Sequence, residues 1–290
     1  MKLKPTLFAL ALVAGLALAG CGSDDKDAAA PDAASDAATA AAPAAAAAPA
    51  TALPPPPQLK ARSFIVIDHE SGRVLAALEP DSRQEPASLT KLMTAYVVFH
   101  SLKEGRIKLG DMVTVSENAW RQAAPKLGGS AMYIEVGTQV SIENLLQGMI
   151  VQSGNDATVA LAEHVAGTEA TFVQMMNNFA KRLGLTGTHF TDAAGMPNPD
   201  QYITARDAAL LANALIHEFP EYYKWYSQKE FTWNGITQQN RNGLLWRDPS
   251  VDGVKTGHTK SAGYCLVTSA KRGDMRLVTA VMGTDSMRAR

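Results

Sequence analysis

Ser88 and Lys91 stand three positions apart at the head of an apolar run, and together they could form a nucleophile and its base. If the run is helical, residues at this spacing share one face, so the hydroxyl and the amine lie within reach of each other. A serine becomes a nucleophile when a neighbouring base takes its proton. A lysine can be that base only where burial or nearby positive charge lowers its pKa. The pattern is common, however, and a helix cap followed by a solvent-facing lysine has the same spacing.

Two further polar sequences could contribute to such a site. Residues 153–155 are Ser-Gly-Asn and interrupt two apolar helical patterns, where an ordinary turn between helices is the alternative. Residues 255–257 are Lys-Thr-Gly and enter an extended segment, where the polar residues could simply protect a sheet edge. Gly257 is more informative, because a residue without a side chain lets another backbone or a peptide-like ligand approach closely. If Lys91 and Lys255 line one cleft, each lowers the pKa of the other by like-charge repulsion.

The elements that must position these residues are strands at both ends of the folded region and helices between them. β-Branched and apolar residues predict one hairpin over residues 63–78 and another over 264–282. An apolar run predicts a helix that starts at Ser88, and Thr204 should cap a later one. Further helices are expected over 140–151, 158–165, 168–183 and 208–217. We therefore expect an α+β fold, with an antiparallel sheet flanked by helices and a helical subdomain.

Composition excludes several classes of protein. The chain has 290 residues, with 27 lysines and arginines against 28 aspartates and glutamates, and its net charge of −1 argues against a nucleic-acid surface. Its two cysteines are too few for a disulfide framework. Cys265, on a predicted buried strand, is expected to be an unreactive core residue. The six histidines are scattered along the sequence, and we expect no metal site and no cofactor.

The N-terminal residues have the layout of a targeting segment. Lys2 and Lys4 precede an apolar run over residues 7–18, which is too short to span a bilayer comfortably. The run ends in Leu-Ala-Gly before Cys21, which resembles the lipobox of bacterial lipoproteins, where the cysteine receives a lipid. Residues 1–20 are therefore expected to be a signal peptide, and Cys21 to anchor a periplasmic protein to a membrane. Ordinary cleavage at a small-residue site is the alternative.

Residues 21–60 have the composition of a tether. A short acidic patch is followed by an alanine- and proline-rich tract that ends in four consecutive prolines at positions 54–57. The prolines interrupt any helix, and the tract lacks the apolar side chains that a core needs. Consecutive prolines favour an extended, semi-rigid spacer. The folded catalytic domain is thus expected over residues 61–290, held away from a membrane surface.

The three polar motifs, Ser-x-x-Lys, Ser-x-Asn and Lys-Thr-Gly, form a rarer coincidence in this order than any one of them alone. Such a set occurs in serine β-lactamases and penicillin-binding proteins. The chain closely resembles the low-molecular-mass penicillin-binding proteins that act as serine-type D-alanyl-D-alanine carboxypeptidases, although its middle motif is Ser-Gly-Asn rather than Ser-Asp-Asn. The resemblance implies the β-lactamase/DD-peptidase-like fold. It covers residues 62–290, and further segments that carry it are 71–75, 152–157, 240–246 and 251–259.

The resemblance implies a role for each motif residue. Ser88 would attack the carbonyl between the terminal D-alanines of a peptidoglycan pentapeptide stem, with Lys91 as its base. Ser153 would pass a proton to the leaving D-alanine. Asn155 would hydrogen-bond the substrate amide; a helix cap is the other interpretation of this residue, and the two are compatible. β-Lactam antibiotics resemble the same peptide end, and they would acylate Ser88.

The oxyanion and the substrate carboxylate need separate partners. By resemblance, the backbone N–H groups of Ser88 and His258 would hold the oxyanion, so the His258 side chain is not required for catalysis. Thr256 is a candidate partner for the carboxylate. Arg241 and Arg290 match arginines that the family places near this site, where structural salt bridges are the alternative. The substrate-binding residues are thus expected to be Lys255, Thr256, Gly257, His258, Arg241 and Arg290.

Three other functions fit parts of the sequence. A serine β-lactamase shares the fold but needs a deacylating glutamate on a loop, whereas residues 185–201 contain Asp192 and Asp200 and no Glu-x-x-Leu-Asn sequence. A D,D-endopeptidase shares the chemistry, and the histidine after Lys-Thr-Gly favours the carboxypeptidase. A non-catalytic cell-wall binding module would not need the intact motifs. Family members continue with a packing helix, and many add a membrane-binding end, so we expect either that the sequence is a fragment or that the lipid at Cys21 replaces that anchor.

Overall fold

The computed structural model describes residues 58–124 and 129–290. The predicted signal peptide, the predicted lipidation site at Cys21 and all but the end of the predicted tether lie outside the described residues. Within the described residues, no helix combines the length and the apolar character that crossing a membrane would require.

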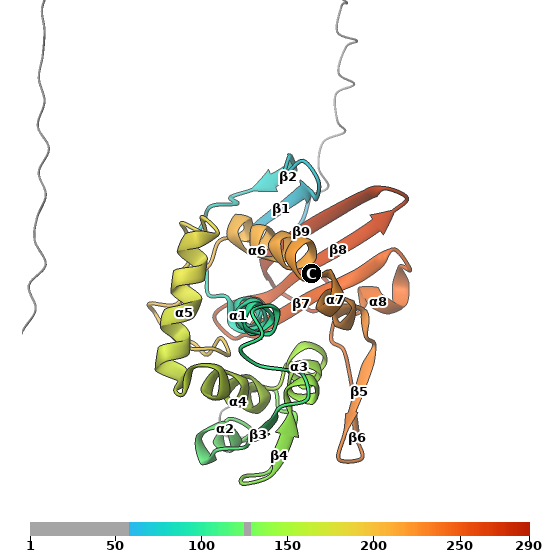
Figure 1. Cartoon of the computed structure of the whole chain (residues 1–290). Coiled ribbons are helices and arrows are strands. Elements are labelled where there is room, and N and C mark those ends of the chain that lie inside the picture. Colours follow the sequence, from blue (N-terminus) through green and yellow to red (C-terminus); the bar gives the residue numbers. More distant parts are fainter. Residues whose placement is uncertain (1–57, 125–128) are drawn as a thin grey trace, which may run out of the picture. The chain divides into compact units, whose positions relative to one another are not determined.

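An antiparallel sheet of five strands forms one side of the described part (Figure 1). Its strands are β1 Ser63–Asp68, β2 Val74–Leu78, β7 Val251–Thr259, β8 Gly263–Arg272 and β9 Met275–Thr284. The order is β2-β1-β9-β8-β7, and every neighbouring pair is antiparallel. The two predicted hairpins therefore join into one sheet, with β7 at one edge.

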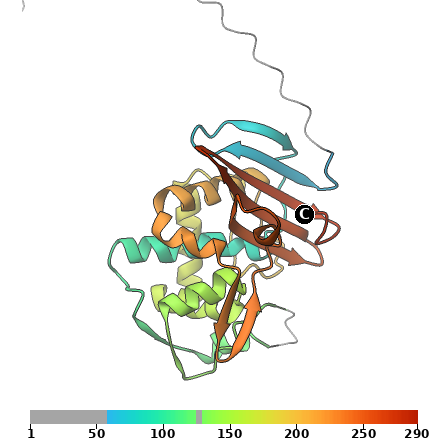
Figure 2. The same cartoon turned by 90° about the vertical axis from the view of Figure 1, so that its right-hand side faces the viewer.

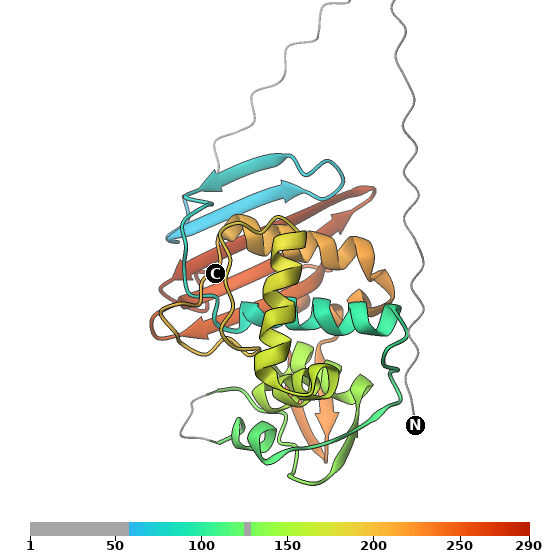
Figure 3. The same ribbon diagram turned by 60° about the vertical axis from the view of Figure 1, so that its left-hand side comes forward.

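Helices cover one face of the sheet and continue into a helical part (Figure 2). The longer ones are α1 Lys91–Lys103, α3 Ile142–Val151, α4 Asn155–Ala166, α5 Glu169–Arg182 and α6 Ala205–Glu218. α6 packs on β1 and β9, whereas α1 contacts α3, α4, α5 and α6 (Figure 3). Residues 92–99 of α1 are all buried, which explains an apolar run with no polar face. The α+β fold with a helical subdomain is confirmed.

Short elements complete the described part. They are β3 Met112–Thr114, α2 Glu117–Arg121, β4 Gln139–Ser141, α7 Pro220–Tyr223, the 3-10 turn η3 Lys224–Ser227, β5 Glu230–Trp233, β6 Ile236–Gln239 and α8 Leu244–Arg247. β3 pairs with β4, and β5 pairs with β6. The helical members span about one turn each, which is too short for periodicity to predict.

Side-chain caps fix the starts of three long helices, α3, α5 and α6. The Ser141 hydroxyl accepts the Asn144 N–H at 3.3 Å, where α3 begins. The Thr204 hydroxyl accepts the Asp207 N–H at 3.0 Å, where α6 begins. Each cap satisfies an N–H group that has no partner inside the helix. The predicted cap at Thr204 is therefore confirmed.

α4 begins earlier than the sequence predicted. Its first residue is Asn155, not Thr158, and its N-cap residue is Gly154, which offers no side-chain cap. The Asn155 N–H donates instead to the Ser130 carbonyl at 2.8 Å. The interpretation of Asn155 as a helix cap is therefore wrong, because the helix start is satisfied by a distant backbone group.

The turn before α1 is tighter than predicted. Residues Ala87–Thr90 form a 3-10 turn, η1, and α1 begins at Lys91 rather than at Ser88. Residues three apart eclipse each other in a 3-10 turn, so this geometry aligns Ser88 with Lys91. Ala87 has φ of +47°, a left-handed conformation that is uncommon outside glycine.

Cys265 lies on β8, and its side chain belongs to the apolar core. Its side chain is fully buried, and burial raises the pKa of the thiol. Because the thiolate is the reactive form, a buried thiol with a raised pKa is inert. The prediction of an unreactive core residue is confirmed.

Candidate active site

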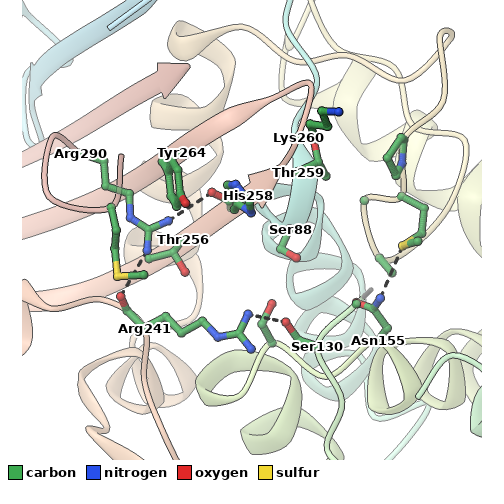
Figure 4. A pocket seen from close by; sticks show the side chains of 18 residues that line it. Ser88, Ser130, Asn155, Arg241, Thr256, His258, Thr259, Lys260, Tyr264 and Arg290 are labelled. Carbon is green, nitrogen blue, oxygen red and sulfur yellow. Dashed lines mark hydrogen bonds between the residues drawn. The ribbon is translucent and has the colours of Figure 1, made fainter. Parts of the chain in front are cut away.

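A cavity of about 510 Å³ opens where η1, the edge strand β7 and the break between α3 and α4 meet (Figure 4). The loop over residues 194–197 completes its wall. The predicted site residues that line it are Ser88, Ser153, Asn155, Arg241, Thr256, Gly257, His258 and Arg290. Among the described residues that line it, none is acidic. Three motifs that are far apart in the sequence therefore meet at one cavity, as the resemblance implied.

Lys91 lies beneath this cavity and is 1% exposed. Its Nζ lies 3.0 Å from the Ser88 Oγ, 2.8 Å from the Asn155 Oδ1 and 2.6 Å from the Ala194 carbonyl oxygen. As a neutral amine, Nζ has two N–H groups, which suit the amide and carbonyl oxygens. Its lone pair is then left for the Ser88 hydroxyl. The contacts of Lys91 therefore match those of a base aimed at Ser88.

Burial makes the neutral form of the Lys91 amine accessible near neutral pH. It lowers the pKa of Lys91 from 10.5 to about 7, because a charged amine loses its hydration there. The charges of Asp192 and Asp156 raise the pKa of Lys91, and the charge of Arg241 lowers it. Near neutral pH, a large fraction of Lys91 is thus uncharged and able to accept a proton.

Lys255 forms a second lysine–serine pair. Its Nζ donates to the Ser153 Oγ at 2.9 Å and to the Thr256 carbonyl at 3.0 Å. Burial lowers the pKa of Lys255 well below its ordinary value, and the charges of Lys91, Arg241 and Arg290 lower it further. The predicted repulsion between the lysines is therefore present at Lys255, although burial is the larger cause.

Ser153 is held in an unusual backbone conformation. Its φ is +61°, and its side chain is almost fully buried while still lining the cavity. A left-handed serine is strained by roughly 1–2 kcal/mol, and such strain is common at functional sites. The hydroxyl is therefore fixed in direction by both the backbone and Lys255.

Asn155 connects the α4 start to Lys91. Its Oδ1 accepts from the Lys91 Nζ, and its Nδ2 lies 3.5 Å from the Met196 sulfur on the cavity wall. Gly129 packs over this amide so closely that a Cβ there would lie 2.3 Å from Nδ2. The amide is thus held in one orientation, with its oxygen towards the base and its nitrogen towards the cavity.

Gly257 allows β7 to approach the nucleophile turn. A Cβ at this position would lie 3.0 Å from the Pro86 carbonyl oxygen and 3.3 Å from the Ala87 Cβ. The prediction of a close backbone approach is confirmed, and the approaching backbone is that of the segment before Ser88. The strand and the turn therefore present Ser88 and His258 to the same cavity.

Two arginines lie at one end of the cavity (Figure 4). The Arg241 Nη1 donates to the Ser130 Oγ at 2.5 Å, and the Arg290 Nη1 lies 3.3 Å from the Gly257 carbonyl oxygen. Neither guanidinium is paired with a carboxylate within the described residues. The salt-bridge alternative is therefore wrong for both residues, and their charge is available to an anionic ligand.

The remaining predicted residues differ in exposure. Thr256 is nearly buried, whereas His258 is exposed. The His258 ring packs against Tyr264, with the ring centroids 4.1 Å apart. Among the described residues, no side-chain hydrogen bond ties this imidazole to Ser88, in keeping with the expectation that His258 contributes through its backbone.

The sequence patterns did not predict two hydrogen bonds of the site. The Ala194 carbonyl accepts from Lys91, and the Ser130 hydroxyl accepts from Arg241. A backbone carbonyl has no signature in residue type, and Ser130 lies in a glycine-rich stretch that resembles any loop. Only the packing of the loops against Lys91 and Arg241 makes these groups part of the site.

The acidic residues of the 185–201 loop do not line the cavity. Asp192 turns inward and accepts N–H groups of its own loop. Asp200 is exposed. The position that a deacylating carboxylate would need is therefore not occupied by either residue.

Comparisons with known proteins agree with this site. A family model for D-alanyl-D-alanine carboxypeptidases matches residues 49–286. The chain is 50% identical over 237 residues to the carboxypeptidase DacA of Haemophilus influenzae, and 52% identical over 236 residues to DacC of Escherichia coli. Each alignment covers 81% of this chain but only 60% and 59% of the relatives, so the chain spans about three-fifths of their length.

A solved structure gives the same result at the level of the fold. Penicillin binding protein 5 from Haemophilus influenzae matches with a TM-score of 0.79 at 50% identity, over 81% of this chain and 68% of that chain. The family model covers most of the sequence and includes all three motifs that meet at the cavity. The chain therefore belongs to the D-alanyl-D-alanine carboxypeptidase family.

Proposed function

We propose that this protein hydrolyses the terminal D-Ala-D-Ala bond of peptidoglycan stem peptides through an acyl-enzyme on Ser88, releasing D-alanine. The observation that carries the proposal is the contact of the buried Lys91 amine with the Ser88 hydroxyl at 3.0 Å. Burial lowers the pKa of this amine to about 7, which suits a general base near neutral pH. The names of the relatives and of the solved structure support the same activity.

Acylation follows from the geometry of the site. The Ser88 Oγ forms a bond to the carbonyl carbon of the penultimate D-alanine while its proton passes to the Lys91 Nζ. The oxyanion would be held by the N–H groups of Ser88 and His258. When the C–N bond breaks, the leaving amine takes a proton, and the Ser153 hydroxyl is the group proposed to deliver it. Its contact with Lys255 at 2.9 Å fixes the direction of this hydroxyl. The proton that Lys91 took from Ser88 replaces the one that Ser153 gives up, so both groups are restored.

Water completes the reaction. With Lys91 neutral again, water adds to the ester carbonyl of the acyl-enzyme as its proton passes to Lys91. Lys91 returns that proton to the Ser88 oxygen as the ester C–O bond breaks, which frees Ser88 and the shortened peptide acid. The free carboxylate of the substrate would lie against Arg241, Arg290 and Thr256. Because these residues stand at one end of the cavity, they would orient the scissile bond over Ser88.

Two rivals use the same fold. A serine β-lactamase needs a deacylating carboxylate, and among the described residues none that lines the cavity is acidic. We therefore favour slow hydrolysis of a β-lactam adduct. A D,D-endopeptidase would use the same residues on a crosslinked peptide, so substrate tests rather than the site geometry must separate it from a carboxypeptidase.

We also propose that residues 1–20 are a signal peptide and that lipid on Cys21 anchors the domain to a membrane in the periplasm. The support is the basic start, the apolar run and the small residues before Cys21. Residues 21–60 would be the tether and 61–290 the catalytic domain. Metabolic labelling with a radioactive fatty acid, compared with a Cys21→Ser variant, tests this; equal labelling of both would contradict it.

The test of the main proposal is covalent labelling with benzylpenicillin, followed by peptide mapping. The intact protein should gain the whole mass of the antibiotic, because the opened ring stays attached, and the adduct should map to Ser88. Ser88→Ala should gain nothing. Release of D-alanine from a pentapeptide, with a crosslinked dimer and a chromogenic β-lactam as parallel substrates, then separates the three activities. An adduct that persists in Ser88→Ala would overturn the nucleophile assignment.

A further inference from the structure

The Lys91 amine depends on a backbone carbonyl whose position must itself be fixed. The shortest of its three polar contacts is the one to the Ala194 carbonyl oxygen, at 2.6 Å. The neighbouring Ala193 carbonyl accepts from the Thr94 hydroxyl at 2.7 Å, one helical turn further along α1. Residues 193–194 therefore lie against the buried start of α1, and a shift of this loop would move the acceptor away from Lys91.

One carboxylate holds this loop in shape. The Asp192 Oδ1 accepts the N–H groups of Ala194 at 2.7 Å and of Gly195 at 2.5 Å. The other oxygen, Oδ2, accepts the Met196 N–H at 3.1 Å and the Gln201 Nε2 at 2.8 Å. These bonds turn the loop back on itself, in the manner of an aspartate that caps its own turn. Asp192 thus fixes the peptide group that contains the Ala194 carbonyl, through the Gly195 N–H, and the preceding peptide group, through the Ala194 N–H.

The same turn packs against the residue before the nucleophile. Gly195 has φ of +89°, and a Cβ on it would lie 1.8 Å from the Ala87 carbonyl oxygen, beside Ser88. Only a glycine permits this approach. The turn that Asp192 caps therefore contacts Lys91 and Ala87, the residue before Ser88, although Asp192 itself does not line the cavity.

Asp192 also contributes a charge in a region that water does not screen well. The other charged groups that act on Lys91 are Asp156 on α4 and Arg241 at the cavity mouth, and the charge of Lys91 in turn acts on Lys255 on β7. The Asp156 carboxylate accepts several N–H groups around residues 132–134, so it is committed to a different loop. Glu169 on α5 faces Asp192 and accepts the Ala193 N–H at 3.1 Å.

We propose that Asp192 is a positioning residue for Lys91: it holds the Ala194 carbonyl against the amine, and its charge sets the pH range over which the amine can take the proton from Ser88. This inference rests on the proposed function, because it assigns a determinant to the base of that reaction. Asp192 reaches no reacting atom and acts entirely through the loop and its field.

The test compares acylation by benzylpenicillin across a pH series in wild type, Asp192→Asn and Asp192→Ser. Removing a negative charge disfavours the protonated amine, so the midpoint of the acidic limb should move down by about one pH unit in both variants. The serine variant keeps a hydroxyl that can cap the turn, so it guards against the asparagine variant failing to fold. Asp200→Asn removes a charge from an exposed position of the same loop and should leave the midpoint unchanged.

The outcomes separate this inference from the proposed function. A wild type that is never acylated at Ser88 contradicts the function itself. A wild type that is acylated, with a midpoint that stays in place in the folded Asp192 variants, overturns the role of Asp192 alone. A lower rate with an unmoved midpoint has the same meaning, because a purely structural loop would change the rate at every pH without moving the midpoint.

Discussion

The two sides of the cavity each carry a buried lysine that contacts a serine, yet the surroundings of the two lysines differ. On the helical side, Lys91 lies 3.0 Å from Ser88, and the carboxylates of Asp192 and Asp156 stabilise its charge. On the sheet edge, Lys255 lies 2.9 Å from Ser153, and every neighbouring charge that acts on it is positive. The same pair of residue types therefore stands in opposite electrostatic fields.

This difference assigns the lysines to different tasks. Lys91 has a pKa of about 7, so it can both take and return a proton during one catalytic cycle near neutral pH. Burial lowers the pKa of Lys255, and the positive charges of Lys91, Arg241 and Arg290 lower it further. An anionic substrate entering beside Arg241 and Arg290 would offset this repulsion. Lys255 thus suits a group that responds to the substrate carboxylate, whereas Lys91 suits a base present beforehand.

The largest expected effect is the loss of the base. Lys91→Met keeps the length and apolar stem of the side chain but cannot accept the Ser88 proton, so acylation by benzylpenicillin should fall about 10³-fold or more. Stopped-flow or mass-spectrometric acylation rates measure this. A melting curve shows that the fold survives. Acylation within tenfold of wild type would mean that another group activates Ser88.

Replacement of the second lysine should have a smaller effect. Lys255→Met removes the partner of Ser153 and one cation near the substrate carboxylate, so acylation should fall about 10²-fold. Lys260→Met is the matched control, since Lys260 is an exposed lysine at the mouth of the same cavity. If the acylation rate falls further in Lys255→Met than in Lys91→Met, the assignment of Lys91 as the base of Ser88 is wrong.

The pH dependence of acylation tests the same difference between Lys91 and Lys255. Lys91 acts as a base only when deprotonated, and its pKa is about 7, so acylation should fall about tenfold for each pH unit below 7. In Lys255→Met the midpoint should remain near 7, because Asp192, Asp156 and Arg241 are the charges that act on Lys91. A midpoint that moves by a full unit in Lys255→Met would show that the two amines titrate together.

Sequence patterns predicted the residues that carry side-chain chemistry but not the backbone groups that hold them. Ser88, Lys91 and Lys255 have recognisable spacing, and Thr204 has the residue type of a cap, so all were found. The Ala194 carbonyl has no such mark, because every residue has a carbonyl. It becomes a partner of Lys91 only through a turn that Asp192 caps.

The starts of α1 and α4 were missed for a related reason. Local propensity favours a helix from Ser88, but the close approach of Gly257 and the left-handed Ala87 leave a 3-10 turn there. Propensity places the start of α4 too late, because Asn155 finds a distant backbone carbonyl rather than a local cap. In both cases a tertiary contact outweighs a local preference that is worth less than about 1 kcal/mol per residue.

The smallest expected effect concerns Ser153, the strained serine that contacts Lys255. Ser153 has φ of +61°, so Ser153→Gly and Ser153→Ala lose the same hydroxyl, but only the glycine variant also relieves the backbone. The glycine variant should therefore be more stable than the alanine variant by about 1 kcal/mol, measured by urea unfolding. Both variants leave Lys255 without its hydroxyl partner, so acylation should fall to a similar extent in the two. If the alanine variant proves the more stable, the left-handed conformation costs nothing here, and strain at Ser153 plays no part in aiming its hydroxyl.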